Sequence, residues 1–122
     1  MGTPGIPGES KTTDNHRVGS PRVLVSPSIL TVNENQTARF HCAASGDPKP
    51  IIVWRKDGTV LRNGHKYRVL RDGELTVKHA QYNDRGVYEC VARTNLERAE
   101  AFTDLVVRGQ YQENLSGVGI VT

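Results

Sequence analysis

The stretch Asp84-Arg-Gly-Val-Tyr-Glu-Cys90 decides how this chain folds. Tyr88 stands two residues before Cys90, so both side chains point to the same side of an extended strand. Cys42 lies earlier, in Ala38-Arg-Phe-His-Cys-Ala-Ala, where apolar residues alternate with polar ones, and Trp54 follows twelve residues after it. The alternation around these residues indicates β-strands, and it makes Cys42, Trp54, Tyr88 and Cys90 candidates for a shared core.

Further short strands, separated by turn residues, are expected on both sides of these positions. Pro27 cannot donate a ladder hydrogen bond, so it should divide an edge strand that switches sheets. Asp57-Gly58 predicts a tight hairpin turn. Apolar alternation predicts strands over residues 23–25, 29–32, 37–44, 51–56, 59–61, 67–70, 74–78, 87–93 and 99–107, with a helical turn at 81–84.

These residues resemble the I-set immunoglobulin family over residues 22–108. The resemblance implies a two-sheet antiparallel sandwich whose core contains Phe40, Trp54, Leu75 and Tyr88, with the Tyr88 hydroxyl bonded to backbone upstream. The matching positions are Glu34, Gln36, Phe40, Cys42, Gly46, Pro48, Pro50, Ile52, Trp54, Lys56, Gly58, Leu75, Val77, Asp84, Gly86, Tyr88, Cys90 and Ala92.

The only two cysteines of the chain suit one Cys42–Cys90 disulfide, as the resemblance also implies. Such a bridge indicates an oxidising compartment, and in the chain-entropy model it stabilises the domain by about 4 kcal/mol. The alternative is a pair of buried free thiols in a cytosolic domain.

The sequence predicts flexible linkers at both ends, residues 1–21 and 109–122. Gly2, Gly5 and Gly8 recur at every third position of the first linker, with Pro4 and Pro7 completing two triplets. Glycine at each third position is what a collagen triple helix requires, so this linker is interpreted as the end of a collagen-like segment. A Gly/Pro-rich linker without a triple helix is the alternative. No run of eighteen apolar residues is present in the sequence.

The sequence departs from the family pattern in two turns. Asn35 replaces a glycine that is frequent in the family, and asparagine tolerates the left-handed conformation, so that turn should be retained. Thr94-Asn95-Leu96-Glu97 lacks the glycine usual between the last two strands, which leaves that turn's conformation open. Asn35-Gln-Thr and Asn114-Leu-Ser are glycosylation sequons.

A run of basic residues between positions 55 and 71 predicts an anion-binding patch. Such a patch could hold a sulfated glycosaminoglycan, such as heparan sulfate, or an anionic lipid surface. A solvated strand edge, where Lys and Arg discourage aggregation, is the interpretation that the sequence favours over ligand binding. Asp84 is expected to pair with Arg68 at the base of the sandwich. The residues assigned to glycosaminoglycan are Arg55, Lys56, Arg62, Lys66 and Arg68, with His65 and Arg71 nearby.

An apolar patch is expected on the outer side of the sheet that contains Trp54 and Cys90. Because those two side chains point inward, their neighbours Val53 and Val91 point outward. On the last strand, Phe102 and Val106 take the same side. A continuous apolar surface ringed by charges is typical of a protein-binding site, whereas singly exposed apolar residues are the alternative.

The function expected from these features is non-catalytic. The four histidines (His16, His41, His65 and His79) are dispersed, and no metal-ligand spacing, phosphate-binding loop or nucleophile elbow is present in the sequence. We expect no cofactor, metal or nucleic acid, and a protein partner that is either homophilic or heterophilic. The resemblance implies an extracellular adhesion module of a matrix or cell-surface protein, with the isolated domain a monomer and a collagenous parent a trimer. A receptor ectodomain or a muscle-filament module is the alternative.

Overall fold

Residues 19–109 are described by the computed structural model, and they form nine strands and one short 3-10 helix. Every predicted strand is present, with bounds that differ by at most one residue from those expected. The elements are β2 (Arg22–Ser26), β3 (Ile29–Asn33), β4 (Ala38–Ser45), β5 (Ile51–Lys56), β6 (Thr59–Val60), β7 (Tyr67–Val69), β8 (Glu74–Val77), η1 (Tyr82–Asp84), β9 (Gly86–Arg93) and β10 (Arg98–Arg108). The Gly-X-Y triplets, the C-terminal linker and Asn114 lie outside the described residues.

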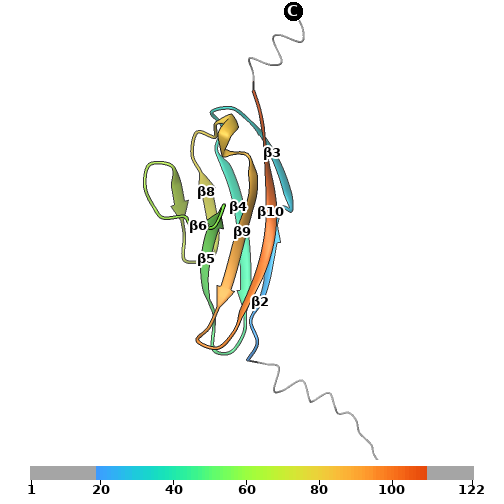
Figure 1. Cartoon of the computed structure of the whole chain (residues 1–122), viewed down its shortest axis with the longest axis vertical. Helices are drawn as coiled ribbons and strands as arrows, with labels where there is room; N and C mark the ends of the chain where they lie inside the picture. The colour runs from blue at the N-terminus through green and yellow to red at the C-terminus, as the bar shows by residue number, and fades with distance from the viewer. Residues whose placement is uncertain (1–18, 110–122) are drawn as a thin grey trace, which may run out of the picture.

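The strands form two sheets that pack face to face (Figure 1). One sheet has the order β3-β10-β9-β5-β6 and the other β2-β4-β8-β7. All pairings are antiparallel except that of β3 with β10, which is parallel. The chain passes from one sheet to the other between β2 and β3, so the switch predicted at Pro27 is confirmed.

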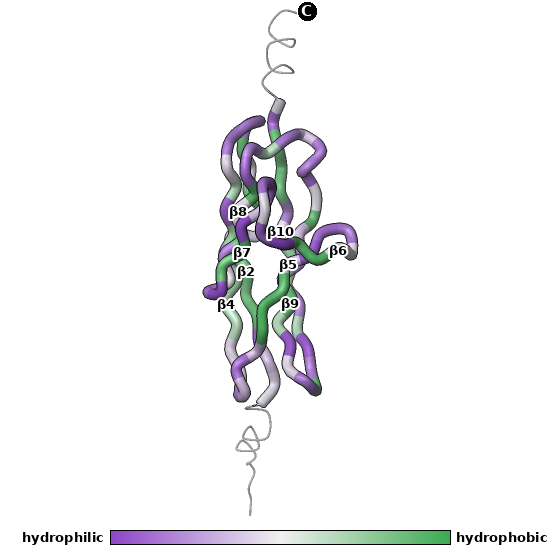
Figure 2. The backbone as a smooth tube through the Cα atoms, turned by 90° about the vertical axis from the view of Figure 1, so that its left-hand side faces the viewer, coloured by the Kyte–Doolittle hydropathy of each residue, from purple (hydrophilic) through white to green (hydrophobic). Residues whose placement is uncertain are grey.

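The core between the sheets contains the residues that the sequence places there. Phe40, Trp54, Leu75 and Tyr88 are each at most 1% exposed. The Phe40 ring lies 6.1 Å from the Trp54 ring and 5.8 Å from the Tyr88 ring, between centroids. The Cys42–Cys90 disulfide is formed and joins the two sheets, with 6.5 Å between the two Cα atoms. Apolar segments follow the strands, while the connecting loops are mostly hydrophilic (Figure 2).

Gly73 fixes Trp54 and Cys42 in this core through its carbonyl oxygen. That oxygen accepts a hydrogen bond from the Trp54 indole Nε1–H at 3.0 Å and another from the Cys42 backbone N–H at 3.0 Å. Gly73 has a φ of +104°, and a Cβ atom there would collide with the Cys42 carbonyl oxygen. The sequence predicts only a hairpin turn at this position, and the contact with the core is a finding of the structure.

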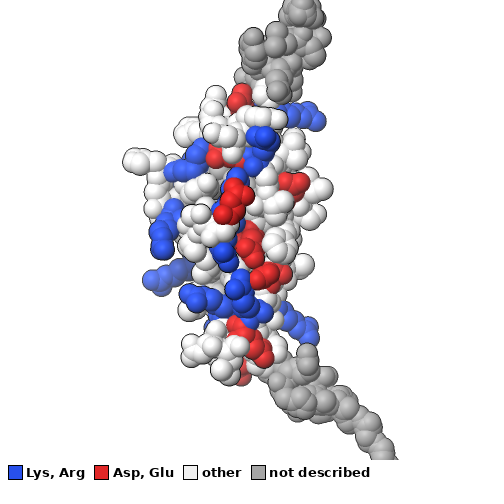
Figure 3. All heavy atoms as spheres, in the orientation of Figure 1, with Lys and Arg blue, Asp and Glu red and all other residues white. Residues whose placement is uncertain are grey.

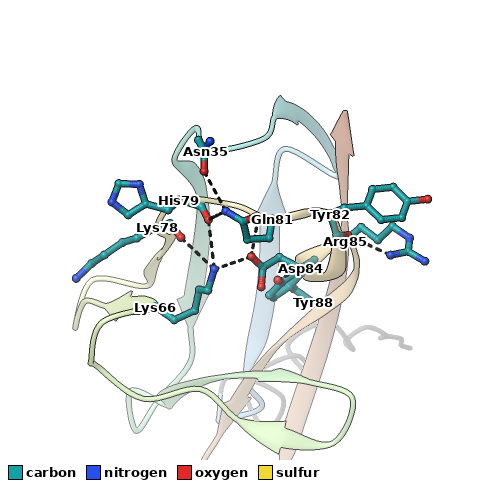
Figure 4. A network of polar contacts seen from close by, with 9 residues as sticks. All are labelled: Asn35, Lys66, Lys78, His79, Gln81, Tyr82, Asp84, Arg85 and Tyr88. Atoms are coloured by element: carbon teal, nitrogen blue, oxygen red, sulfur yellow. Dashed lines mark hydrogen bonds and ion pairs between the residues drawn. The ribbon is translucent and has the colours of Figure 1, made fainter. Parts of the chain in front are cut away.

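A polar network closes one end of the sandwich (Figure 4). The Tyr88 hydroxyl donates to the Asp84 carbonyl at 2.6 Å, which confirms the expected bond to backbone upstream. Burial raises the pKa of Tyr88 well above its ordinary value, so the hydroxyl remains protonated and keeps donating. The Asp84 carboxylate in turn accepts from the Lys66 ammonium at 2.7 Å and from the Gln81 backbone N–H at 2.8 Å.

The cation expected to pair with Asp84 was Arg68, and that expectation is wrong. Arg68 lies within β7 opposite Thr76, with its exposed side chain on the outer side of its sheet. Lys66 precedes the strand, at the end of the sandwich where η1 lies, and its ammonium also donates to the carbonyls of Lys78 and His79, each at 3.3 Å. Lys66 therefore satisfies a carboxylate that is 90% buried, given the 10% exposure of the Asp84 side chain.

Replacing Lys66 with methionine is expected to cost about 1–3 kcal/mol of unfolding free energy, because the buried Asp84 carboxylate loses its charged donor. Arg68→Met is the matched control, and a surface change of that kind should cost less than about 0.5 kcal/mol. Urea unfolding followed by Trp54 fluorescence measures both values. Equal losses in the two variants would contradict the assignment of Lys66.

Two turns depart from the family pattern, and the structure shows how each is built. Asn35 has a φ of +72°, which confirms the expected left-handed turn. In the turn after β9, the Thr94 hydroxyl accepts hydrogen bonds from the backbone N–H groups of Leu96 at 3.3 Å and Glu97 at 3.2 Å. The threonine side chain thus stabilises the turn without the usual glycine.

Among the described residues, no helix has the length and apolar character to cross a membrane.

Candidate functional site

The candidate site is the outer face of the five-stranded sheet, which is turned away from the core. Strand register confirms that Val53, Val91, Phe102 and Val106 point outward, because their neighbours Trp54, Cys90, Leu105 and Val107 are buried in the core. Four side chains are therefore oriented as the sequence predicts.

The first half of this face contains a hollow, which we call the arginine-rimmed hollow. Its apolar floor consists of Val53, Val60 and Val91, and its volume is about 390 Å³. Val53 and Val91 lie directly opposite each other on β5 and β9. Val91 is only 3% exposed, so it forms the bottom of the hollow instead of a raised surface. The rim contains Arg55, Arg62, Arg93 and Arg98.

The rim arginines differ in how far their charges are neutralised. Arg55 donates to the Gly58 carbonyl at 3.1 Å and has the Glu89 carboxylate 3.9 Å from its Nε. Arg98 forms a 2.6 Å ion pair with Glu100. Within residues 19–109, neither Arg62 nor Arg93 forms an ion pair, and both side chains are exposed. The hollow therefore carries positive charge that is available to a partner.

The second half of the face contains Phe102, which is 56% exposed. Glu89 lies directly opposite Phe102 on β9, and Glu100 and Asp104 flank it two residues away on the same side of β10. We call these four residues the Phe102 knob. Val87 and Ile29, 53% and 63% exposed, lie opposite Asp104 on the two neighbouring strands.

The expected continuous patch of Val53, Val91, Phe102 and Val106 is not formed. Glu100 lies opposite Val91, and Glu89 lies opposite Phe102, so carboxylates separate the valines of the hollow from the aromatic ring. The inward–outward alternation of a strand determines orientation, but continuity depends on which residues face each other across strands. The face therefore has two halves, one rimmed by arginine and the other by carboxylates.

The five residues assigned to glycosaminoglycan are likewise not brought together. Lys66 is paired with Asp84, and Arg68 belongs to the other sheet. Lys56 points inward, 3.3 Å from Asp57 and 5.5 Å from the centre of the Tyr88 ring. Only Arg55 and Arg62 reach the hollow, where they meet Arg93 and Arg98, which the glycosaminoglycan assignment did not include. The pairing of β9 with β5 and β10 was the signal that could have identified Arg93 and Arg98.

The Asn35 sequon lies in an exposed turn next to η1. The Asn35 side-chain oxygen accepts a hydrogen bond from the Gln81 Nε2 at 3.0 Å. The glycosylation of Asn35 stays a prediction.

Across the part of the chain that the structure describes, no group of three or more His, Cys, Asp and Glu side chains could hold a metal ion.

Comparisons with known proteins identify relatives of this chain. Residues 21–107 match the family model described as the immunoglobulin I-set domain. Hemicentin-2 of Mus musculus is 40% identical over 91 residues, which cover 75% of this chain and 2% of hemicentin-2. Roundabout homolog 1 of Rattus norvegicus is 36% identical over 100 residues, which cover 82% of this chain and 6% of that protein.

A solved structure described as a titin M10–obscurin-like 1 Ig complex has the same fold. One chain of it superposes with a TM-score of 0.67 at 30% identity, over 73% of this chain and 94% of that chain. The family model matches residues 21–107, and the domain bounds expected from the sequence, residues 22–108, stay a prediction. The chain spans 2% and 6% of the length of the two curated relatives.

Proposed function

Because this chain belongs to the immunoglobulin I-set family, we propose that it is a non-catalytic protein-binding module of a multidomain cell-surface or matrix protein. The observation that carries the proposal is the outer face of the five-stranded sheet. It combines an exposed aromatic ring, 56% accessible, with an arginine-rimmed apolar hollow. Aromatic residues and arginine are enriched at protein interfaces and dominate their binding energy. The titin M10–obscurin-like 1 complex supports a protein as partner, since it joins domains of this kind.

The disulfide supports an extracellular location. Bridges of this kind persist in secreted and cell-surface proteins and are rare in reducing compartments. The Cys42–Cys90 bridge is fully buried and joins two cysteines that lie 48 positions apart in the sequence. The exposed Asn35 sequon agrees with passage through the secretory pathway. Mass spectrometry of protein from its native cells should find glycan on Asn35; unmodified Asn35 together with free thiols would favour the intracellular alternative.

The placement of the two ends supports a module in a series of domains. The described chain enters at one end of the sandwich before β2 and leaves at the opposite end after β10 (Figure 1). Domains linked in this way line up end to end and leave the outer face of the five-stranded sheet accessible from the side. A collagenous parent, and the trimer that it would form, rest on the Gly-X-Y triplets alone and stay predictions.

The binding proposal is tested with beads that carry many copies of the chain, because multivalent display reveals weak binding. Phe102→Asp should reduce bead binding to cell surfaces or matrix proteins by about thirtyfold or more, the effect of losing one interface hot spot. The matched control is Leu24→Asp, which alters a residue that is 71% exposed on β2 of the other sheet.

Leu24→Asp beads should bind like the unaltered chain. If binding instead survives Phe102→Asp and is lost in Leu24→Asp, the interaction surface lies on the four-stranded sheet and the proposed site is wrong. Binding unaffected by both changes would also contradict the assignment of the outer face.

A further inference from the structure

The two halves of the outer face complement each other in shape and in charge. The arginine-rimmed hollow is concave, with Arg62 and Arg93 free of ion pairs within residues 19–109. In the Phe102 knob, Phe102 is 56% exposed and Asp104 has no cationic partner among those residues, whereas Glu89 and Glu100 pair with Arg55 and Arg98. On the side of the molecule drawn in Figure 3, Lys and Arg side chains occur over the whole height of the domain among Asp and Glu side chains, and several basic side chains lie close together in the lower part.

The hollow suits an aromatic side chain with carboxylates around it. Its floor of three valines offers an apolar contact, and about 390 Å³ leaves room for a phenylalanine ring. Arginine guanidinium groups on the rim can lie over such a ring in cation–π contact and can bond flanking carboxylates in bidentate fashion. A sulfated glycan would use the arginines but would leave the apolar floor without a matching group. The observations therefore favour a protein segment that presents both features.

We propose that the segment belongs to a second copy of this chain, and that two copies associate face to face with Phe102 of each copy in the arginine-rimmed hollow of the other. The proposal rests on the proposed function, in that the outer face is the binding surface. The hollow and the knob adjoin on one face, since Val91 lies opposite Val53 on one side and Glu100 on the other. A single two-fold interface can therefore contain both contacts at once.

The symmetry of such a pair also predicts which charges meet. For Phe102 of each copy to reach the hollow of the other, the two-fold axis must lie in the plane of the interface. It must also pass midway between Phe102 and the hollow, perpendicular to the line that joins them. Asp104 lies beyond Phe102 on the side away from the hollow. The residue that Asp104 meets on the other copy must then lie beyond the hollow on the side away from Phe102. That position is next to β6, where Arg62 lies. Asp104 of one copy is thus expected to meet Arg62 of the other, twice in each pair.

This proposed arrangement differs from the expectation that the isolated domain is a monomer. Association through one small face should be weak and reversible, with a Kd of about 10–100 µM, in the range of transient encounters. Sedimentation equilibrium of the 122-residue chain over a concentration series measures it. The variants are Arg62→Glu and Asp104→Lys, with Arg68→Glu on the other sheet as a control that has the same charge change as Arg62→Glu.

The unaltered chain and Arg68→Glu should dimerise alike, and each of the two test variants alone should dimerise at least about tenfold more weakly, because like charges meet in both contacts. An equimolar mixture of Arg62→Glu and Asp104→Lys should recover dimerisation. In the mixed pair, the new glutamate faces the new lysine, and the original Arg62 faces the original Asp104. This recovery also shows that both variants are folded.

A chain that stays monomeric at millimolar concentration would overturn the proposal, as would a mixture that fails to associate. Binding of the monomeric chain to heparin or to an acidic protein, lost in Arg62→Glu, would assign the hollow to a foreign partner. Bead binding that depends on Phe102 would still stand in that case, so failure of self-association is distinguishable from failure of the proposed function.

Discussion

Replacing Gly73 with alanine is expected to destabilise the domain by about 3 kcal/mol or more, a large part of the 5–15 kcal/mol typical of small domains. A φ of +104° is unfavourable for any residue with a Cβ atom, and this Cβ would collide with the Cys42 carbonyl oxygen. Relieving the collision would move the Gly73 carbonyl oxygen away from its two donors. These are the Trp54 Nε1–H and the Cys42 backbone N–H, each at 3.0 Å. One substitution in a surface hairpin therefore disturbs the centre of the core.

Thermal melts followed by circular dichroism measure the effect, which corresponds to a fall in Tm of roughly 12–24 °C for a domain of this size. Gly64→Ala is the matched control, because a Cβ atom there meets nothing within 4 Å. The control should melt within a few degrees of the unaltered chain. Equal Tm values for the two variants would show that Gly73 does not constrain the core.

Truncating Trp54 to alanine is expected to cost about 3–5 kcal/mol, as for other large core side chains. Trp54 is completely buried, and its ring contacts Phe40 at 6.1 Å between centroids. The truncation leaves a cavity beside the Cys42–Cys90 disulfide and removes the hydrogen bond to the Gly73 carbonyl. Guanidinium unfolding followed by circular dichroism is the measurement, since the variant lacks the tryptophan used for fluorescence.

Trp54→Phe separates packing from hydrogen bonding. It keeps an aromatic ring in the core and loses the indole N–H, while the Gly73 carbonyl still accepts from the Cys42 N–H at 3.0 Å. Its cost should be about 1–2 kcal/mol, clearly smaller than that of alanine. A loss below about 1 kcal/mol for Trp54→Ala would contradict the central placement of the indole.

The fold could be predicted from the sequence because its determinants are local in pattern. Alternation around Cys42, Trp54 and Cys90 assigns each side chain to the core or to the surface, and one buried face makes the register unambiguous. The left-handed turn at Asn35 follows from the preferences of a single residue, and its φ of +72° agrees.

The candidate site was harder to predict because it depends on pairing between distant strands. Clustering along the sequence suggested a basic patch that included Lys66 and Arg68, but one is paired with Asp84 and the other lies on the opposite sheet. The hollow instead collects Arg93 and Arg98 from β9 and β10, more than thirty positions after Arg55. Proximity in sequence predicts proximity in space only within one strand or hairpin.

The core and the candidate site are nevertheless connected. Trp54 and Cys90 point inward at adjacent positions of β5 and β9, which turns Val53 and Val91 outward to form the floor of the hollow. The same alternation along β10 buries Leu105 and exposes Phe102. The residues that stabilise the domain thus also determine which side chains a partner meets.

The central claim is that the outer face of the five-stranded sheet is the interaction surface, and amide NMR spectra of the labelled chain recorded over a concentration series test it most directly. The account predicts that concentration shifts the amide resonances of Val53, Arg62, Val91, Phe102 and Asp104, all on that face. Amides of the four-stranded sheet, such as those of Leu24, Arg39 and Arg68, should stay in place. Shifts confined to the four-stranded sheet would contradict this claim, and no shifts up to millimolar concentration would contradict the self-association of the face.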